Sequence, residues 1–242
     1  ALGGGETETF TAEVMNDGEE GSVVSFVTYP GQELMRDESF SDGSLPEGWS
    51  TATNAECDNP GWYVTEDASS SYFTIPPGDG FYIATNDDAC GSSSDGSNDM
   101  LYTNEISLPD GMVELSFQRY FTAGYNQTLQ IYVSQDNWET YDEVLNLGYW
   151  EGSEEWVKET IDLQAYAGES VALAFHSNDN GNWASGVALD DIQLGMTPLW
   201  ISSSSTGTIQ YQGVETFEFS ISTAGLSDGN YSLSLLHISE PT

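Results

Sequence analysis

Basic residues are almost missing from this sequence. Of its 242 residues only three are lysine or arginine, against 40 aspartates and glutamates, so the formal net charge is −37. A field of this sign repels nucleic acid and anionic membranes, which makes both poor partners. It attracts cations, and its self-repulsion destabilises the chain unless salt screens it or bound ions neutralise it. The acidity therefore fits either a halophilic, high-salt habitat or a calcium-rich exterior.

Several catalytic and metal-binding motifs are also missing. The sequence has no Gly-x-Ser-x-Gly elbow, phosphate-binding loop or dinucleotide fingerprint. Its two histidines, His176 and His237, and its two cysteines form no zinc-binding spacing. No apolar run is long enough to span a membrane, so we expect no membrane insertion. With His176 as the one plausible general base, we expect the chain not to be an enzyme.

Short runs of alternating apolar and polar residues fill most of the chain, broken by Gly, Asn, Asp, Ser and Pro. In the run 129–133, for example, Leu129, Ile131 and Val133 alternate with polar or amphipathic neighbours, which predicts a strand with one buried face. The strands expected most clearly cover residues 10–14, 23–28, 81–84, 112–118, 129–133, 170–176, 187–194 and 214–222. This regular spacing of short strands predicts an all-β sandwich or jelly roll.

The two cysteines, Cys57 and Cys90, are expected to form a disulfide, because an even count in a chain of exported character favours pairing. Two free buried thiols are the alternative. A bridge between them would close a loop of 33 residues and contribute about 3–4 kcal/mol in the chain-entropy model.

The middle of the chain resembles the MAM-like jelly rolls of bacterial surface proteins, the group that includes cleaved-adhesin and choice-of-anchor modules. Six segments carry the resemblance, in order: 38–49 (ESFSDGSLPEGW), 61–63 (GWY), 84–90 (ATNDDAC), 98–108 (NDMLYTNEISL), 161–168 (IDLQAYAG) and 178–192 (NDNGNWASGVALDDI). The resemblance implies a jelly-roll, galactose-binding-like sandwich over residues 35–196. It also implies a secreted or cell-surface, extracellular location and a role in adhesion.

The two flanks resemble halves of one bacterial Ig-like domain, carried by residues 8–18 (ETFTAEVMNDG) on one side and 200–209 with 224–231 on the other. We expect residues 1–34 to pair with 197–242, with the jelly roll inserted between them, since insertion is tolerated where chain ends lie close together. The last residues, 233–242 (LSLLHISEPT), resemble a translated sequencing adapter. We therefore interpret the sequence as a metagenomic fragment of a larger multidomain chain, in which residues 234–242 are not biological.

Calcium is the cofactor that the resemblance implies, as an ion that ties the first strand of the jelly roll to the last. The acidic side chains offered by those strands are Glu38, Asp42, Asp190 and Asp191. Neighbours on a strand point to opposite faces, so Asp191 is favoured over Asp190 unless a bulge intervenes. Solvated surface acids are the alternative reading.

A second cation site is expected beside Cys90, from side chains that the disulfide would bring together: Asn86, Asp87, Asp88 and Asp99, with Asn98 next to the last. An ordinary Asx-rich turn explains the same residues. Asp179 and Asn180 form a weaker third candidate.

Aromatic residues among turn-forming neighbours are candidates for sugar platforms. The residues selected are Trp138, Tyr149, Trp150 and Trp183, with Tyr125 and Tyr141 as further candidates. Core packing is the alternative, and it is favoured for Trp49, Trp62 and Trp156. The sequence thus predicts a non-catalytic, calcium-binding adhesion or carbohydrate-binding module, whose partner is a glycan or a surface protein. A structural spacer or an accessory domain of an exported peptidase is the alternative function.

Overall fold

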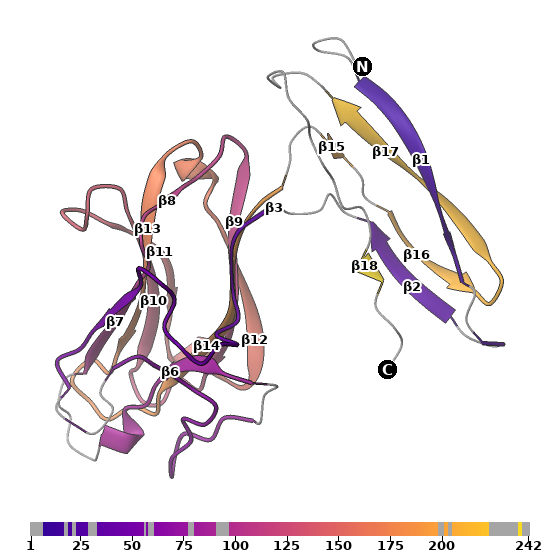
Figure 1. The fold of residues 1–242 in the computed structure, drawn as a ribbon. Coiled ribbons are helices and arrows are strands. Elements are labelled where there is room, and N and C mark those ends of the chain that lie inside the picture. The colour runs from indigo at the N-terminus through magenta and orange to yellow at the C-terminus, as the bar shows by residue number, and fades with distance from the viewer. Residues whose placement is uncertain are drawn as a thin grey trace. The chain divides into compact units, whose positions relative to one another are not determined.

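The computed structural model describes residues 7–16, 19–20, 23–28, 33–55, 57, 61–76, 80–90, 97–197, 201–202, 205–222 and 237–238. The chain divides into two compact units, drawn as ribbons in Figure 1. The larger comprises residues 34–195, and the smaller comprises residues 1–33 together with 196–242.

The larger unit is a sandwich of two six-stranded sheets (Figure 1). In the first sheet the order is β11-β10-β13-β7-β4, with β8 also pairing β13; in the second it is β12-β9-β14-β6-β5, with β3 also pairing β14. The strands are β3 (Glu33–Glu38), β4 (Ser50–Ala52), β5 (Tyr63–Thr65), β6 (Tyr82–Thr85), β7 (Asn98–Tyr102), β8 (Ile106–Ser107), β9 (Met112–Phe121), β10 (Thr128–Ser134), β11 (Asp142–Leu147), β12 (Ser153–Asp162), β13 (Ser170–Asn178) and β14 (Val187–Thr197). Every register described within these sheets is antiparallel, and the all-β jelly-roll class predicted from the sequence is confirmed.

The core lies between the two sheets, where both contribute their inward-facing apolar residues. In β10 the alternation predicted from the sequence is confirmed, since Leu129, Ile131 and Val133 are all buried. Phe117 of β9 and Phe175 of β13 meet across the sandwich in an edge-to-face contact, with ring centroids 5.5 Å apart. Such aromatic pairs stabilise the packing of one sheet on the other beyond the burial of their area.

The second sheet is also covered on its outer face. Residues 66–76, which follow β5, lie over it and bury Phe73 and Ile75 against tyrosines of β6 and β9. The hydroxyl of Tyr82 accepts a hydrogen bond from the Ala68 N–H (2.9 Å), and that of Tyr120 donates one to the carbonyl of Thr74 (2.6 Å). Both hydroxyls thus satisfy polar backbone groups that burial would otherwise leave unpaired.

The disulfide predicted from the sequence is confirmed, between Cys57 and Cys90, whose Cα atoms are 5.1 Å apart. Cys90 ends a short 3-10 turn, η1 (Asp88–Cys90), directly after β6. The two other 3-10 turns described are η2 (Tyr149–Glu151) and η3 (Gln164–Tyr166).

The smaller unit contains two three-stranded sheets, β1-β17-β15 and β16-β2-β18 (Figure 1). Their strands are β1 (Thr7–Met15), β2 (Val23–Thr28), β15 (Ile201–Ser202), β16 (Ser205–Gln210), β17 (Val214–Ser222) and β18 (His237–Ile238). The N-terminal strand β1 pairs antiparallel with β17, and Phe10 stacks on Phe219 with ring centroids 5.5 Å apart. The side chains of Val14, Phe26 and Phe217 lie outside the described part of the structure, as do residues 223–236 and 239–242. The Ig-like assignment stays a prediction.

Candidate ligand-binding site

A pocket of about 630 Å³ lies at one end of the sandwich, where β6, β9 and β13 end and β10 and β14 begin. It is lined by residues from four loops: Ser70, Ser71, Tyr72, Asp88, Ala89, Tyr125 and Trp183. Pockets of this size are typical of small-molecule and oligosaccharide-sized ligands.

Three aromatic rings form the apolar part of the pocket, with Trp183 at their centre. Its ring centroid lies 5.7 Å from that of Tyr72 and 4.9 Å from that of Tyr125, and both tyrosine rings stand nearly perpendicular to it (89° and 83°). The two tyrosines remain exposed, at 74% and 65% of their full surface. Large aromatic rings left in solvent but held against one another form a ready apolar surface for a ligand.

Hydrogen bonds hold the loop of Trp183 against the loop of Tyr125. The side-chain amide of Asn180 donates to the carbonyl of Asn126 (2.7 Å), the neighbour of Tyr125. Asn180 has a positive φ of 54°, which asparagine tolerates better than most residues. Within the same loop, the Asn178 and Asp179 side chains accept hydrogen bonds from the backbone N–H groups of Asn180 (2.7 Å) and Gly181 (2.8 Å). These bonds connect and order the backbone of the two loops that carry Trp183 and Tyr125.

Among the described residues that line the pocket, Asp88 is the one that carries a charge. Its Oδ2 accepts hydrogen bonds from the Ser70 hydroxyl (2.5 Å) and the Tyr72 N–H (2.9 Å), so the carboxylate fixes the loop that carries Tyr72. Its own N–H donates to the carbonyl of Ser185 (3.1 Å). The preceding Asp87 accepts from the N–H of Ala184 (2.6 Å). Asp87 and Asp88 thus join η1 to the segment that follows Trp183.

Only some of the aromatic residues that the sequence suggested as ligand contacts line this pocket. Trp183 lines the pocket, and so does Tyr125. Trp138 is half-buried and packs on Tyr102 of β7, with ring centroids 5.0 Å apart. Tyr72 was missed, because a lone tyrosine after three serines carries no periodic signal. The same run of hydroxyl residues beside an aromatic ring is nevertheless the composition that a polar-rimmed apolar site requires.

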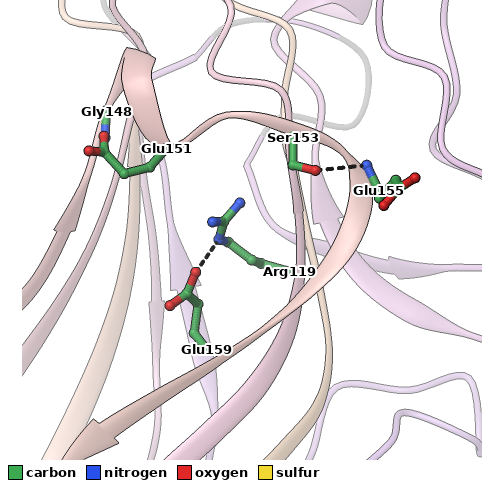
Figure 2. Close-up of polar contacts among 6 residues, drawn as sticks. All are labelled: Arg119, Gly148, Glu151, Ser153, Glu155 and Glu159. Carbon is green, nitrogen blue, oxygen red and sulfur yellow. Dashed lines mark hydrogen bonds and ion pairs between the residues drawn. The ribbon is translucent and has the colours of Figure 1, made fainter.

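Tyr149 and Trp150 form a separate exposed aromatic pair, 61% and 88% exposed, with ring centroids 5.1 Å apart. They lie on η2, whose turn is closed by a hydrogen bond from the Gly148 N–H to Glu151 Oε2 (2.9 Å). The surroundings of this turn are drawn in Figure 2.

Figure 2 also shows the ion pair between Arg119 of β9 and Glu159 of β12, with Nε and Oε1 2.8 Å apart. It is the one ion pair among the residues that the structure describes. Beside it, the pairing of β12 with β9 shifts register between Ser153 and Val157. The Ser153 hydroxyl accepts a hydrogen bond from the Glu155 N–H (3.1 Å) within this irregular stretch.

His176, the candidate general base, lies on β13 and is buried. Its Nδ1 is 3.2 Å from the hydroxyl of Tyr132, and its Nε2 contacts the side-chain oxygen of Asn98. Burial lowers the pKa of His176 and favours its neutral form. Both ring nitrogens therefore have protein partners, which is the arrangement of a histidine that stabilises a sheet.

The four acids expected at the first calcium site differ in their burial and their hydrogen bonds, and the pKa shifts of Asp190 and Asp42 have opposite directions. Asp190 is half-buried, and its pKa is raised to about 6, first by burial and then by the charges of Asp191 and Glu38, while a hydrogen bond from the Asp191 N–H opposes the rise. Glu38 accepts a hydrogen bond from the Phe40 N–H (2.8 Å). Asp42 closes a turn by accepting from the Ser44 N–H (2.9 Å), and this bond lowers its pKa.

The strand that carries Asp190 and Asp191 departs from strict alternation. Leu189 and Ile192 are both buried in the core between the sheets, although residues three apart on a regular strand face opposite ways. Asp191 has a positive φ of 48° and is exposed. An extra residue in β14 therefore forms a bulge at the acidic pair, and it leaves Asp190 as the more buried acid.

The side chains expected at the second calcium site are engaged by protein donors. Asp99 is buried and accepts hydrogen bonds from the hydroxyls of Thr53 (2.5 Å) and Thr85. Asn86 accepts from the Ala89 N–H (3.0 Å), and Asp87 accepts from the Ser97 hydroxyl (3.0 Å). Across the described ranges, no three histidine, cysteine, aspartate or glutamate side chains come together in a group that could hold a metal ion.

The larger unit matches a known domain family. The sequence model of the MAM domain (meprin/A5/mu) matches residues 39–198. The comparison with curated proteins found no match. Within the described residues, no helix has the length and apolar character needed to cross a membrane.

Several solved structures are similar to the chain in fold. The K3 cleaved adhesin domain of Lys-gingipain from Porphyromonas gingivalis is 19% identical, with a TM-score of 0.49, and the match covers 68% of this chain and 99% of that one. The K1 cleaved adhesin domain of the same protein is 17% identical, with a TM-score of 0.47 and coverage of 74% and 100%. The CBM22-1 xylan-binding domain of Paenibacillus barcinonensis Xyn10C is 19% identical, with a TM-score of 0.43 and coverage of 69% and 96%.

Proposed function

Because the chain belongs to the MAM domain family, we propose that it is a non-catalytic adhesion module that binds carbohydrate in the pocket formed by Tyr72, Tyr125 and Trp183. The observation that carries this proposal is the set of exposed aromatic rings fixed around one pocket. A pyranose ring has an apolar C–H face that packs on an aromatic ring and hydroxyls that need polar partners. Ser70, Ser71 and Asp88 supply such partners at the rim.

The rigidity of the loops supports binding of a weakly hydrophobic ligand such as a sugar. Asn180 and Asp88 hold the rings in place through hydrogen bonds to the neighbouring loops. Ordering of side chains on binding costs affinity, so rings that are ordered beforehand leave more of the interaction free energy for the ligand. The proposed glycan is displayed on a cell or matrix surface, and the protein acts outside the cell.

Calcium is part of the same proposal, at Glu38, the last residue of β3, and the acidic pair within β14. The support is the position of Asp190, whose pKa is raised first by burial and then by the charges of Asp191 and Glu38; a divalent cation would relieve the repulsion among these charges. Calcium takes six to eight oxygen ligands, so backbone carbonyls and water would have to complete the shell around these carboxylates. Calcium in this role stabilises the fold and takes no part in chemistry.

A glycan array with three proteins tests the carbohydrate proposal. The wild type should bind, and Trp183→Ala should lose affinity by about 30-fold or more, because truncating a central aromatic anchor costs about 2 kcal/mol or more. Trp150→Ala is the matched control, since it removes an exposed tryptophan of the same domain that lies outside the pocket. Melting curves of each variant establish that it is folded.

The outcomes separate the alternatives. Loss of binding in Trp150→Ala with retention in Trp183→Ala would move the site to the Tyr149–Trp150 pair. An array with no binding by folded wild-type protein would contradict the proposal and favour a structural spacer or an accessory domain of an exported peptidase.

A further inference from the structure

The chemistry of the pocket wall narrows the glycans that it can hold. We propose that the pocket prefers carbohydrates that carry a free amino group, such as deacetylated hexosamines, over neutral or acidic ones; this inference rests on the carbohydrate-binding function proposed above. Asp88 and the three rings around Trp183 carry the argument.

The described part of the pocket wall carries a single negative charge. Asp88 is the only carboxylic acid among the lining residues that the structure describes, and no lysine, arginine or histidine is found with it in that set. Two of the three basic side chains of the protein have partners of their own: Arg119 is paired with Glu159, and Arg36 donates to the side chain of Asn104. A ligand cation would therefore meet no competing positive group at the wall of the pocket.

The carboxylate of Asp88 is held through hydrogen bonds to only one of its two oxygens. Its Oδ2 accepts the two bonds from Ser70 and Tyr72, which fix the plane of the group. In the described part of the chain, no protein donor is hydrogen-bonded to its Oδ1. An ammonium group is a compact donor that matches this oxygen, and a charge-assisted hydrogen bond of this kind is stronger than one to a sugar hydroxyl.

The aromatic rings favour the same ligand. A cation close to the face of a tryptophan or tyrosine is attracted by the negative charge density of the ring. Tyr72 and Tyr125 stand nearly perpendicular to Trp183, so their rings present surfaces to the pocket in different directions. An amino sugar can thus pack its C–H face on one ring while its ammonium lies near another ring and Asp88.

Acidic sugars are disfavoured by the same features. A uronate or sulfate would face Asp88 without a basic partner at the wall, and it would approach a chain with a net charge of −37. A neutral N-acetylated sugar would leave Asp88 Oδ1 to water and would gain neither the charge-assisted bond nor the ring–cation attraction.

The test compares two ligands that differ only in acetylation. Binding of chitosan and chitin oligosaccharides of equal length is measured by calorimetry at about pH 6, where the free amine is protonated. The wild type should prefer chitosan by about tenfold or more, the size of one charge-assisted hydrogen bond. Asp88→Asn should reduce this ratio by about tenfold, because the amide oxygen can still accept from Ser70 and Tyr72 while the free oxygen is replaced by a donor.

Non-specific attraction of chitosan to an acidic protein is controlled by Glu169→Gln. This exposed residue precedes β13, at the opposite end of that strand from the Trp183 loop, and its substitution changes the net charge by the same amount. The chitosan preference should be unchanged in Glu169→Gln, and binding of both ligands should be weakened in Trp183→Ala.

Two results would overturn the amino-sugar preference while leaving carbohydrate binding intact. One is equal affinity of the wild type for the two oligosaccharides, and the other is a chitosan preference that survives in Asp88→Asn. A glycan array without any binding would instead contradict the proposed function itself.

Discussion

Replacing Asp190 by asparagine should stabilise the protein when divalent cations are removed, and the gain should disappear in acid. Asp190 is half-buried beside Asp191 and Glu38, and its pKa is raised to about 6. Between about pH 4 and pH 6 the folded state keeps a proton on Asp190 that the unfolded state has released. The free energy of unfolding therefore falls as the pH rises through this window, and it stays lower at neutral pH.

The size of the change in the free energy of unfolding follows from the pKa shift of Asp190. A rise of about two units corresponds to roughly 3 kcal/mol at about 1.4 kcal/mol per unit. Since Asp190 is only half-buried, solvent screening reduces this to between about 1 and 2 kcal/mol. Asparagine keeps an oxygen for the Asp191 N–H, which donates to Asp190 Oδ1 at 2.8 Å, so the substitution removes the charge and little else.

Thermal unfolding in chelator measures the difference. At about pH 7.5 the melting temperature of Asp190→Asn should exceed that of the wild type by about 2–4 °C for each kcal/mol. At about pH 3.5 the two proteins should melt together, since Asp190 is then protonated in the folded wild type and largely protonated when unfolded. Glu169→Gln removes one exposed charge and reports the general effect of lower net charge. A gain no larger than that of Glu169→Gln, or a gain independent of pH, would refute the reasoning.

Calcium should also stabilise the wild type, by about 2.7 kcal/mol at 100 times its dissociation constant. Glu38→Gln should abolish that gain in a melting assay. A gain that survives this substitution would locate the ion elsewhere. Cys57→Ser should lower the free energy of unfolding in a denaturant titration by about 3–4 kcal/mol, because it opens the 33-residue loop closed by Cys90; an unchanged midpoint would contradict this. Gly186→Ala should lower the melting temperature by an amount that corresponds to about 1–3 kcal/mol, since its Cβ would lie 2.6 Å from the Thr85 carbonyl oxygen; a wild-type melting temperature would show that the backbone there yields easily.

Local patterns in the sequence are sufficient for the fold class and the disulfide. The alternation around Leu129, Ile131 and Val133 reflects burial of one face, which a strand repeats every second residue, so the pattern and the structure agree. The pairing of Cys57 with Cys90 needed only a count of two.

The bulge in β14 is harder to predict, because alternation assumes a regular strand. The apolar residues Leu189, Ile192 and Leu194 are spaced by three and then by two, and the spacing of three marks the inserted residue. Without that reading, alternation favours Asp191 as the inward-facing acid, whereas Asp190 is the half-buried one. The calcium site itself stays a prediction.

The pocket could not be assembled from the sequence, because it depends on contacts between segments far apart along the chain. Tyr72 reaches Trp183 because residues 66–76 lie on the outer face of the second sheet, where Phe73 packs with Tyr120. Periodicity describes how one segment is buried and says nothing of which loop crosses which sheet. Trp183 and Tyr125 were candidates from the sequence, but Tyr72 and the meeting of the three rings came only with the tertiary structure.

The position of the disulfide has a consequence for when the protein can bind. Cys90 ends the 3-10 turn whose first two residues, Asp88 and Ala89, line the pocket, so the bridge is attached directly to the pocket wall. In a reducing compartment this turn would be anchored only by hydrogen bonds, and we expect the pocket to be less well ordered. The proposed binding of glycans would then depend on whether this disulfide is formed.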